Sequence, residues 1–558
     1  MRKVKSLLVL SATFALFGGA SSVYAAGNLL AVGGQLRASN TAIYKKLVDL
    51  GGGLASARIA IMPTAAKSMA SSEKFKNELL ALGVPAEHIT IVPIDRTNYA
   101  ERMNDPQAAK TIKDATAVWF VGGDQSRISK ALYNADGSPS MALQAVTNVY
   151  DKGGVIAGSS AGASAMSVYM PTAYGSVIDT LDFGIAKSPE QRGTALLRGA
   201  GLFKYGIIDQ HFDQIKETTT GRAGRMASYL VDGPEHTGFG LETNTAMWVK
   251  PSGELEVIGE GYLTIMDAGQ ATREFGTFGT EVRNIRLAML SNGDRYNFST
   301  HEITIAPGKQ QIKPGNEALK GNELIPDLSA VAAIRRAVLF GLADNSSSIQ
   351  TGLMTRYNLL NGYHHSYRFD FTKTAEFKSY NKSFDSLDSY TAEGVRLDIV
   401  PVDASLNAPT MSTPNDIETE ANAESIKAVV YRGLMTTNAD RNFEPDRPIT
   451  KGELANTLYL TLGSQLTGER RPSFPEVQNY VLRDQAEIVV GNGWMASGEH
   501  FNPQERVNRT EWEKVAKLMF ARNEAIPTGL TPSVDTSVPR REVAYLIALA
   551  YRLSSDKK

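Results

Sequence analysis

The residues best suited to chemistry lie in a glycine-rich stretch around Ser160. Residues 153–164 read GGVIAGSSAGAS, an apolar run followed by small residues on both sides of this serine. Such a sequence predicts a buried strand that ends in a sharp turn, which lifts the hydroxyl above the strand end and beside the N-terminus of the next helix. Similar turns also bind phosphates or simply allow close packing, so the motif alone leaves these alternatives open.

Two further apolar runs end in residues that suit nucleophilic catalysis by a serine. Residues 119–125, WFVGGDQ, predict a strand followed by a Gly-Gly turn, whose backbone N–H groups can face a substrate carbonyl. Residues 206–212, GIIDQHF, predict a strand that delivers His211, one of only seven histidines in the chain. A histidine near a nucleophilic serine can act as general base, whereas a hydrogen-bonded structural histidine is the alternative.

The surrounding elements indicate how these turns come together. Predicted strands lie near 28–32, 59–62, 88–92 and 117–120, and predicted helices near 40–50, 70–82, 105–113 and 125–134. This alternation predicts an α/β fold with a doubly wound parallel sheet. Such sheets bind ligands at the carboxyl ends of their strands, so we expect the three turns to share one site.

The GGDQ turn, the GSSAGAS turn and the IIDQHF strand, in this order, resemble cyanophycinase and its relatives, serine peptidases related to peptidase E. The resemblance covers about residues 28–300 and implies a flavodoxin-like fold with the nucleophile at a strand-to-helix elbow. It also implies a Ser-His-Glu triad, in which Ser160 is the nucleophile and His211 the base. The other residues that it implies are Gly123 and Ala161 for the oxyanion hole, and Gln125, Asp209, Gln210, Arg222 and Arg225 for the substrate.

The acid of the triad lies in a segment that departs from the family's pattern. Residues 238–246, GFGLETNTA, resemble the family's GIGIDENTA, but its Asp-Glu pair is Glu242-Thr243 here. We expect Glu242 to orient the imidazole, because it is the only carboxylate in the segment. The alternatives are that the orienting acid is absent, or that it is Asp209 beside the histidine.

The arginines after the histidine also differ from the family. Cyanophycinases carry an RxRxGR run closely behind this motif, whereas the corresponding segment here retains Arg222 and Arg225 and has no match for the first arginine. Fixed guanidinium groups can clamp substrate carboxylates, and the alternative is that both are solvated helix side chains. The resemblance therefore supports the catalytic class of the cyanophycinases for this chain more strongly than it supports their substrate.

Composition limits the remaining functions. The chain has 558 residues, 42% hydrophobic and 21% charged, which is ordinary for a globular protein of several domains. Its net charge of −1 provides no overall field that favours nucleic acid. There are no cysteines, which excludes disulfides and thiol chemistry. We expect no metal and no cofactor, because the adjacent His364 and His365 lack a third ligand at suitable spacing.

Residues 1–26 predict a secretory signal peptide. Basic residues precede an apolar stretch at 7–17, and residues 23–25, VYA, offer small side chains at the outer cleavage positions. The apolar stretch is too short for a membrane anchor, so the mature chain is expected to start near Gly27 without a transmembrane segment. This predicts export.

The C-terminal part contains an imperfect repeat. The motifs ITKGE, VNRTE and VPRRE begin at Ile449, Val507 and Val538, and loops with the pattern F-x-P precede the first two. The period and order predict a helix-loop-helix module repeated three times. Each motif also has the composition of an ordinary helix start, which is the structural alternative for these positions.

These repeats, at about 422–463, 473–522 and 523–555, resemble S-layer homology (SLH) domains, which hold exported bacterial proteins on cell-wall polysaccharide. The resemblance implies that the basic residue of each motif meets the anionic secondary cell-wall glycan. By position these residues are Lys451, Arg509 and Arg540. The third copy lacks a clear first helix.

Together these patterns predict an exported serine peptidase of the cyanophycinase type, which cleaves cyanophycin or related aspartyl peptides through an acyl-enzyme and is attached to the cell wall. Its expected parts are the signal peptide, a catalytic domain (27–310), an intermediate region with a linker (311–421) and α-helical SLH-like repeats (422–558). The alternatives are an α/β-hydrolase-like esterase and a noncatalytic wall-associated binding protein that retains the fold. A homodimer is left open.

Overall fold

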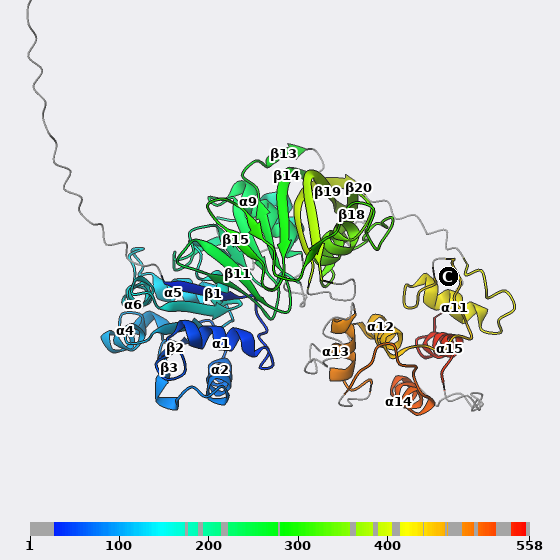
Figure 1. The fold of residues 1–558 in the computed structure, drawn as a ribbon, viewed down its shortest axis with the longest axis horizontal. Coiled ribbons are helices and arrows are strands. Elements are labelled where there is room, and N and C mark those ends of the chain that lie inside the picture. Colours follow the sequence, from blue (N-terminus) through cyan, green and yellow to red (C-terminus); the bar gives the residue numbers. More distant parts are fainter. Residues whose placement is uncertain are drawn as a thin grey trace, which may run out of the picture.

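The computed structural model describes residues 27–553, except for 173–176, 188–192, 214–220, 277–278, 358–363, 383–388, 404–412, 439, 464–465, 467–481, 496–499 and 521–536. The predicted signal peptide, the first part of the predicted linker at 408–424 and the starts of the second and third repeats therefore lie outside the described residues. Figure 1 shows two sheets in the blue to green part of the chain and a group of yellow to red helices.

The first sheet has nine strands in the order β16-β15-β11-β10-β1-β5-β4-β2-β3. Its parallel strands are β1 (Asn28–Val32), β2 (Ile59–Met62), β3 (Ile89–Ile91), β4 (Ala117–Phe120) and β5 (Val155–Ser159). Antiparallel strands extend it: β10 (Thr245–Val249), β11 (Glu254–Gly259), β15 (Arg295–Asn297) and β16 (Ile303–Thr304). The α/β fold with a central sheet is thus confirmed, although its later strands are antiparallel, and only β10–β11 and β15–β16 are joined by short hairpin connections.

Helices cover both faces of this sheet, and the residues of β1 show why. Leu30 and Val32 share one core with α1 (Thr41–Leu50) and α2 (Ala70–Ala81). Leu29 and Ala31 belong to the opposite core, which contains side chains of the later helices. Because successive strand residues point to opposite faces, an apolar strand buried on both sides needs such a double layer. These later helices are α4 (Pro106–Lys113), α5 (Gln125–Leu132) and α6 (Met141–Asp151), with the short α3 (Tyr99–Arg102) and a 3-10 turn at Ala86–His88 between them and α2.

The second sheet also has nine strands, and it joins the catalytic region to the intermediate region. Its main order is β17-β19-β20-β14-β12-β9-β8. The strands are β8 (Ile207–Asp209), β9 (Thr237–Leu241), β12 (Leu263–Asp267), β13 (Thr272–Gly276), β14 (Gly279–Leu290), β17 (Gln310–Gln311), β18 (Ile349–Tyr357), β19 (His364–Asn381) and β20 (Thr391–Asp403). The region after residue 310 therefore continues the sheet that begins with β8, the strand before His211.

The remaining elements of this part of the chain are helices and the two-stranded sheet of β6 and β7. They are α7 (Ala161–Ser164), β6 (Tyr169–Pro171), α8 (Val177–Phe183), β7 (Leu196–Arg198), α9 (Arg222–Asp232), α10 (Ala333–Arg335) and a π-helix at Arg336–Ala343. Side chains of α9 and of the π-helix share one core with β14, β19 and β20. The intermediate region is thus packed onto the strands that carry the candidate site.

Helices of the C-terminal part enclose a separate core. They are α11 (Ala423–Tyr431), α12 (Lys451–Leu462), α13 (Arg483–Gly491), α14 (Arg509–Phe520) and α15 (Arg540–Ala550). The three sequence motifs begin α12, α14 and α15, as predicted. Thr450 and Glu453 form a reciprocal capping box at the start of α12. In the part of the chain that the structure describes, no helix has both the length and the apolar character needed to cross a membrane.

Helix α13 of the C-terminal part forms ion pairs with Arg37, which follows β1, and with Glu260, which follows β11. Glu487 has no exposed side-chain surface and pairs with Arg37 at 2.9 Å. Arg483 pairs with Glu487 at 2.9 Å and with Glu260 at 2.5 Å. Arg37 also approaches Glu260 at 3.4 Å, which closes an alternating network of two arginines and two glutamates between the two parts of the chain.

Candidate active site

Ser160 lies at the sharp turn that the sequence predicts. It connects β5 to α7 with φ 57° and ψ −120°, a conformation that non-glycine residues rarely adopt. Its backbone N–H donates to the Val32 carbonyl at 2.9 Å, which ties the turn to the neighbouring strand. A Cβ on Gly162 would lie 2.2 Å from the carbonyl oxygen of Phe120, so the helix can approach β4 only with glycine there. The small residues of the motif thus allow a strained turn that presents the serine.

His211 meets this serine. It follows β8 with φ 51°, and its Nε2 lies 2.7 Å from Ser160 Oγ. The backbone N–H of His211 donates to the Gly33 carbonyl at 2.8 Å. Gly34 (φ 118°) lies against the ring, where a Cβ would be 2.2 Å from Cε1. Two segments that are 51 positions apart therefore form a nucleophile–base pair within hydrogen-bond reach.

Glu242 lies just after β9 and is 3% exposed. Its Oε2 accepts a hydrogen bond from the Tyr262 backbone N–H at 3.0 Å, and its Oε1 accepts one from Arg335 Nε at 3.2 Å. Burial raises the pKa of Glu242 to about 7, and the positive charge of Arg335 acts against this shift. The carboxylate is therefore fixed in a buried position by partners from two other elements.

A glycine loop relates this carboxylate segment to the histidine. The Gly33 carbonyl accepts from His211 N–H, and the next carbonyl, of Gly34, accepts from Asn244 N–H at 2.8 Å. Asn244 stands two positions after Glu242 and has φ 56°. One loop after β1 thus contacts both the residue that carries the imidazole and the segment that carries the acid.

Asp209, the alternative acid, has other partners. It is fully buried, forms an ion pair with Arg222, and accepts a hydrogen bond from the Tyr229 hydroxyl at 3.2 Å. The neighbouring Gln210 accepts a hydrogen bond from the Ser164 hydroxyl at 2.5 Å. These contacts tie β8 to α9 and α7, so both residues help to position the strand end that delivers His211.

The two arginines of the substrate hypothesis lie in the first turn and a half of α9. Arg222 and Arg225 are 6% and 5% exposed, which contradicts the alternative that they are solvated helix side chains. Burial, together with the nearby charge of Arg222, lowers the pKa of Arg225 to about 10. Its Nε has no hydrogen-bond partner among the described residues. The nearby charge of Asp209 favours the protonated form of this buried guanidinium and so acts against the fall in its pKa.

The remaining predicted residues lie at the ends of β4 and β5. Gly123 stands between β4 and α5, and Ala161 begins α7 directly after Ser160. Gln125 begins α5, and its side-chain amide donates to the Pro171 carbonyl at 2.6 Å. That bond links α5 to β6, so Gln125 has a structural partner in this state of the protein.

Two contacts of the site were not predicted from the sequence motifs. Arg335 reaches Glu242 from 93 positions further along the chain. Thr243, which stands where the family pattern has its glutamate, donates its hydroxyl to Asp213 at 2.5 Å. Only the position of Thr243 within the GFGLETNTA segment could have drawn attention to this second contact.

The three basic residues of the C-terminal motifs form a ring of ion pairs. Lys451 lies 3.9 Å from Glu511, Arg509 lies 2.5 Å from Glu542, and Arg540 lies 2.9 Å from Glu453. Each basic residue therefore pairs with the glutamate of the next motif, and the third returns to the first. Lys451 also pairs with Glu505 at 2.9 Å.

This ring changes the expectation for Arg540. Its side chain is 4% exposed, and it also donates to the carbonyls of Phe443 and Thr436. A guanidinium that is satisfied inside the protein is not available to a glycan, so Arg540 is a structural residue of the C-terminal core. Arg509 retains 18% side-chain exposure beside Glu542.

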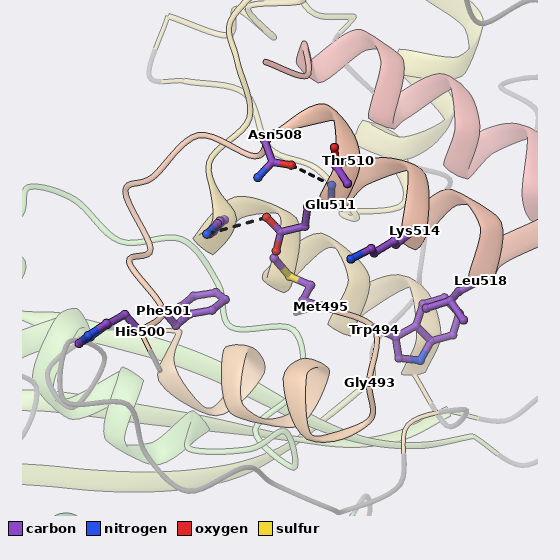
Figure 2. Close-up of a pocket in the computed structure, with 11 residues that line it drawn as sticks. Gly493, Trp494, Met495, His500, Phe501, Asn508, Thr510, Glu511, Lys514 and Leu518 are labelled. Atoms are coloured by element: carbon purple, nitrogen blue, oxygen red, sulfur yellow. Dashed lines mark hydrogen bonds and ion pairs between the residues drawn. The ribbon is translucent and has the colours of Figure 1, made fainter. Parts of the chain in front are cut away.

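Lys451 borders a pocket of about 590 Å³ between α12, α13 and α14. Figure 2 shows Trp494, Lys514 and Leu518 among the residues that line it, with a dashed line at the ion pair of Glu511. The pocket combines an aromatic ring, two lysines and a carboxylate. The two ammonium groups suit an anionic ligand, and the indole of Trp494 adds a flat apolar face with an N–H donor.

Comparisons with known proteins identify two families in this chain. The family model of Peptidase family S51 matches residues 29–256, and that of the S-layer homology domain matches residues 415–455. A cyanophycinase of Geminocystis herdmanii (strain PCC 6308) is 30% identical over 205 residues, 36% of this chain and 68% of that protein. A cyanophycinase of Trichormus variabilis (strain ATCC 29413 / PCC 7937) is 28% identical over 268 residues, 47% of this chain and 81% of that protein.

A solved structure of a peptidase from an acI-B1 Actinobacterium is also similar. It is 22% identical with a TM-score of 0.33, and the likeness covers 43% of this chain and 90% of that one. The extent of the match to the cyanophycinases decides the family. This chain belongs to peptidase family S51, is a serine-type peptidase and carries an S-layer homology domain.

Proposed function

We propose that this peptidase is exported, is held on the cell wall, and hydrolyses aspartyl peptide bonds of cyanophycin or a related acidic peptide. The contact of 2.7 Å between Ser160 Oγ and His211 Nε2 at the strained turn carries the proposal. The cyanophycinases among the relatives support the substrate class, and the SLH domain supports the location.

In the proposed reaction each of these groups has one role. Ser160 Oγ attacks the scissile carbonyl while His211 Nε2 takes its proton, and the resulting oxyanion is stabilised by the backbone N–H groups of Gly123 and Ala161. His211 then gives the proton to the leaving amine, which leaves an ester on Ser160. Water, deprotonated by the same imidazole, releases the acid product and restores the serine. In this proposal Glu242 stabilises the imidazolium.

A mass-spectrometric assay tests the activity. The purified protein is incubated with cyanophycin, with a mixed library of aspartyl peptides and with a panel of simple esters. We expect products cleaved at the carbonyl of aspartyl residues. Hydrolysis of esters without cleavage of any aspartyl peptide would favour the esterase alternative, and no turnover of any substrate would favour the noncatalytic one.

Arg225 is expected to bind a carboxylate of the substrate. Arg225→Ala should raise KM for aspartyl peptides about ten- to a hundredfold, since a hydrogen bond to a charged group contributes about 1.5–3 kcal/mol. Arg225→Lys keeps the charge but loses the planar fork, so its KM should be intermediate. Steady-state kinetics on one aspartyl peptide measures both. An unchanged KM in Arg225→Ala would exclude this contact.

The pocket beside Lys451 is expected to bind the anionic wall polysaccharide. Full-length protein should sediment with purified cell-wall material, and Lys451→Ala combined with Lys514→Ala should release most of it. Added salt should weaken the binding, because exposed charges are screened over about 10 Å at 0.1 M ionic strength. Lys517→Ala, an exposed substitution on the same helix outside the pocket, is the matched control. Normal sedimentation of the double variant would contradict the site.

A further inference from the structure

Arg335 brings a charge to the candidate active site from a region that the family match does not cover. The match to Peptidase family S51 ends at residue 256, and α10, which carries Arg335, lies well beyond it. The Arg335 guanidinium donates through Nε to Glu242 Oε1 at 3.2 Å, and its Nη2 lies 3.1 Å from Oε2. The two nitrogens therefore meet the two oxygens of one carboxylate, which is the bidentate geometry that fixes a carboxylate most firmly.

The fold holds α10 in this place at several points. The Ala332 backbone N–H, immediately before the helix, donates to the carbonyl of Asp213 at 2.8 Å, two positions after His211. The π-helix that follows is buried in the core of the second sheet. In that sheet β20 pairs with β14, β14 with β12, and β12 with β9, whose last residue precedes Glu242. The arginine and its carboxylate thus belong to one packed unit.

Glu242 needs such a partner because of its surroundings. At 3% exposure, its charged form is strongly disfavoured by the loss of hydration. The charges of Asp213 and of Asp484 on α13 disfavour it further, while Arg335 and the Tyr262 N–H favour it. The guanidinium of Arg335, which lies 5.5 Å from the centre of the Tyr262 ring, is the one cation among these named groups.

We propose that Arg335 is a positioning residue of this peptidase: it favours the ionised form of Glu242 and orients the carboxylate so that it supports His211 during catalysis. The proposal rests on the triad role proposed above for Glu242. It gives the region from residue 311 to residue 403 a function, because this region supplies the counter-charge of the catalytic acid. The catalytic unit then extends to the end of β20.

Replacement of Arg335 tests the proposal through the pH profile. In the full-length protein, Arg335→Ala should lower kcat about ten- to a hundredfold, with a smaller change in KM. The acidic limb of the kcat profile should move to higher pH, because Glu242 without its counter-charge holds its proton to a higher pH. Guanidinium ions added to Arg335→Ala should restore part of the activity.

Two further variants keep the test decisive. Arg336→Ala removes the exposed neighbouring arginine and should behave like the unmodified protein. Arg335→Gln retains a hydrogen-bond donor of similar reach without the charge, so it should show the same shift of the acidic limb even where the alanine variant folds poorly. A wild-type profile in Arg335→Gln, or an activity loss that is equal at every pH and not rescued by guanidinium, would overturn the proposal.

The same set of experiments distinguishes this inference from the proposed function. Full activity in Ser160→Ala would show that the serine mechanism itself is wrong. An inactive Ser160→Ala together with an unshifted profile in both Arg335 variants would leave the serine mechanism in place and remove only the role of Arg335.

Discussion

Ser160→Ala is expected to lower turnover by several orders of magnitude while the protein remains folded. The hydroxyl that lies 2.7 Å from His211 Nε2 is the only group at this turn that forms the acyl bond in the proposed mechanism. Loss of a nucleophile removes the chemistry of both half-reactions, and known serine peptidases lose about 10⁶-fold in kcat. Alanine fits the turn sterically, so we expect the thermal unfolding temperature to stay within a few degrees.

Ser159→Ala is the matched control for this experiment. Ser159 is the last residue of β5 and stands next to the nucleophile. Its removal should leave kcat within a few-fold of the unmodified protein. If Ser160→Ala retained full activity toward aspartyl peptides, the serine mechanism would be wrong, whatever the behaviour of the control.

Glu242→Gln is expected to give the second largest loss. A neutral amide cannot stabilise the imidazolium, and it can hold the ring in the wrong tautomer, an effect that costs up to about 10⁴-fold in a Ser-His-Asp triad. We expect a loss of about 10²- to 10⁴-fold in kcat at pH 7, measured by steady-state kinetics. The unfolding temperature should also fall, because Arg335 loses its buried counter-charge, so a thermal melt must show that the variant is still folded at the assay temperature.

Asp209→Asn separates the two candidate acids. Asp209 pairs with Arg222 and Tyr229, so its replacement should mainly disturb strand β8 and lower thermal stability. A larger loss of kcat in Asp209→Asn than in Glu242→Gln would assign the orienting role to Asp209. If neither variant affected kcat, the triad would have no orienting acid, in agreement with Thr243 at the position of the family's glutamate.

The nucleophile and the base could be predicted from the sequence because each depends on a local pattern. The glycines around Ser160 are required by a turn that folds within a few residues, and His211 follows a short apolar strand. Arg335 could not be predicted in this way. Its contact with Glu242 spans 93 positions and depends on the packing of a whole sheet, for which no short motif exists.

Part of the second sheet has a clear strand pattern in its sequence. In β19, Tyr367, Phe369 and Phe371 are fully buried and alternate with polar residues, which is the period of a strand with one face in a core. The alternation predicts strands, but it does not indicate that these strands pair with the sheet of the catalytic site.

For the C-terminal motifs, the sequence pattern suggests more functional residues than the structure supports. A basic residue recurs in all three motifs, and the sequence alone suggests three equal glycan contacts. In the structure Lys451 borders a pocket, whereas the guanidinium of Arg540 is enclosed by Glu453 and backbone carbonyls. The pattern specifies the start of each helix, but the packing of three motifs around one core decides which side chains face outward.

Detection of an acyl group on Ser160 is the most direct test of the serine mechanism. The protein is mixed with an activated aspartyl ester, which should acylate it faster than the acyl-enzyme is hydrolysed, and is quenched in acid. Trypsin then releases the peptide of residues 153–187, whose mass and fragmentation locate the added group. The serine mechanism predicts one aspartyl group on Ser160, which disappears as the reaction proceeds and is absent from Ser160→Ala. Acylation of another residue, or turnover of the ester without any adduct at Ser160, would contradict it.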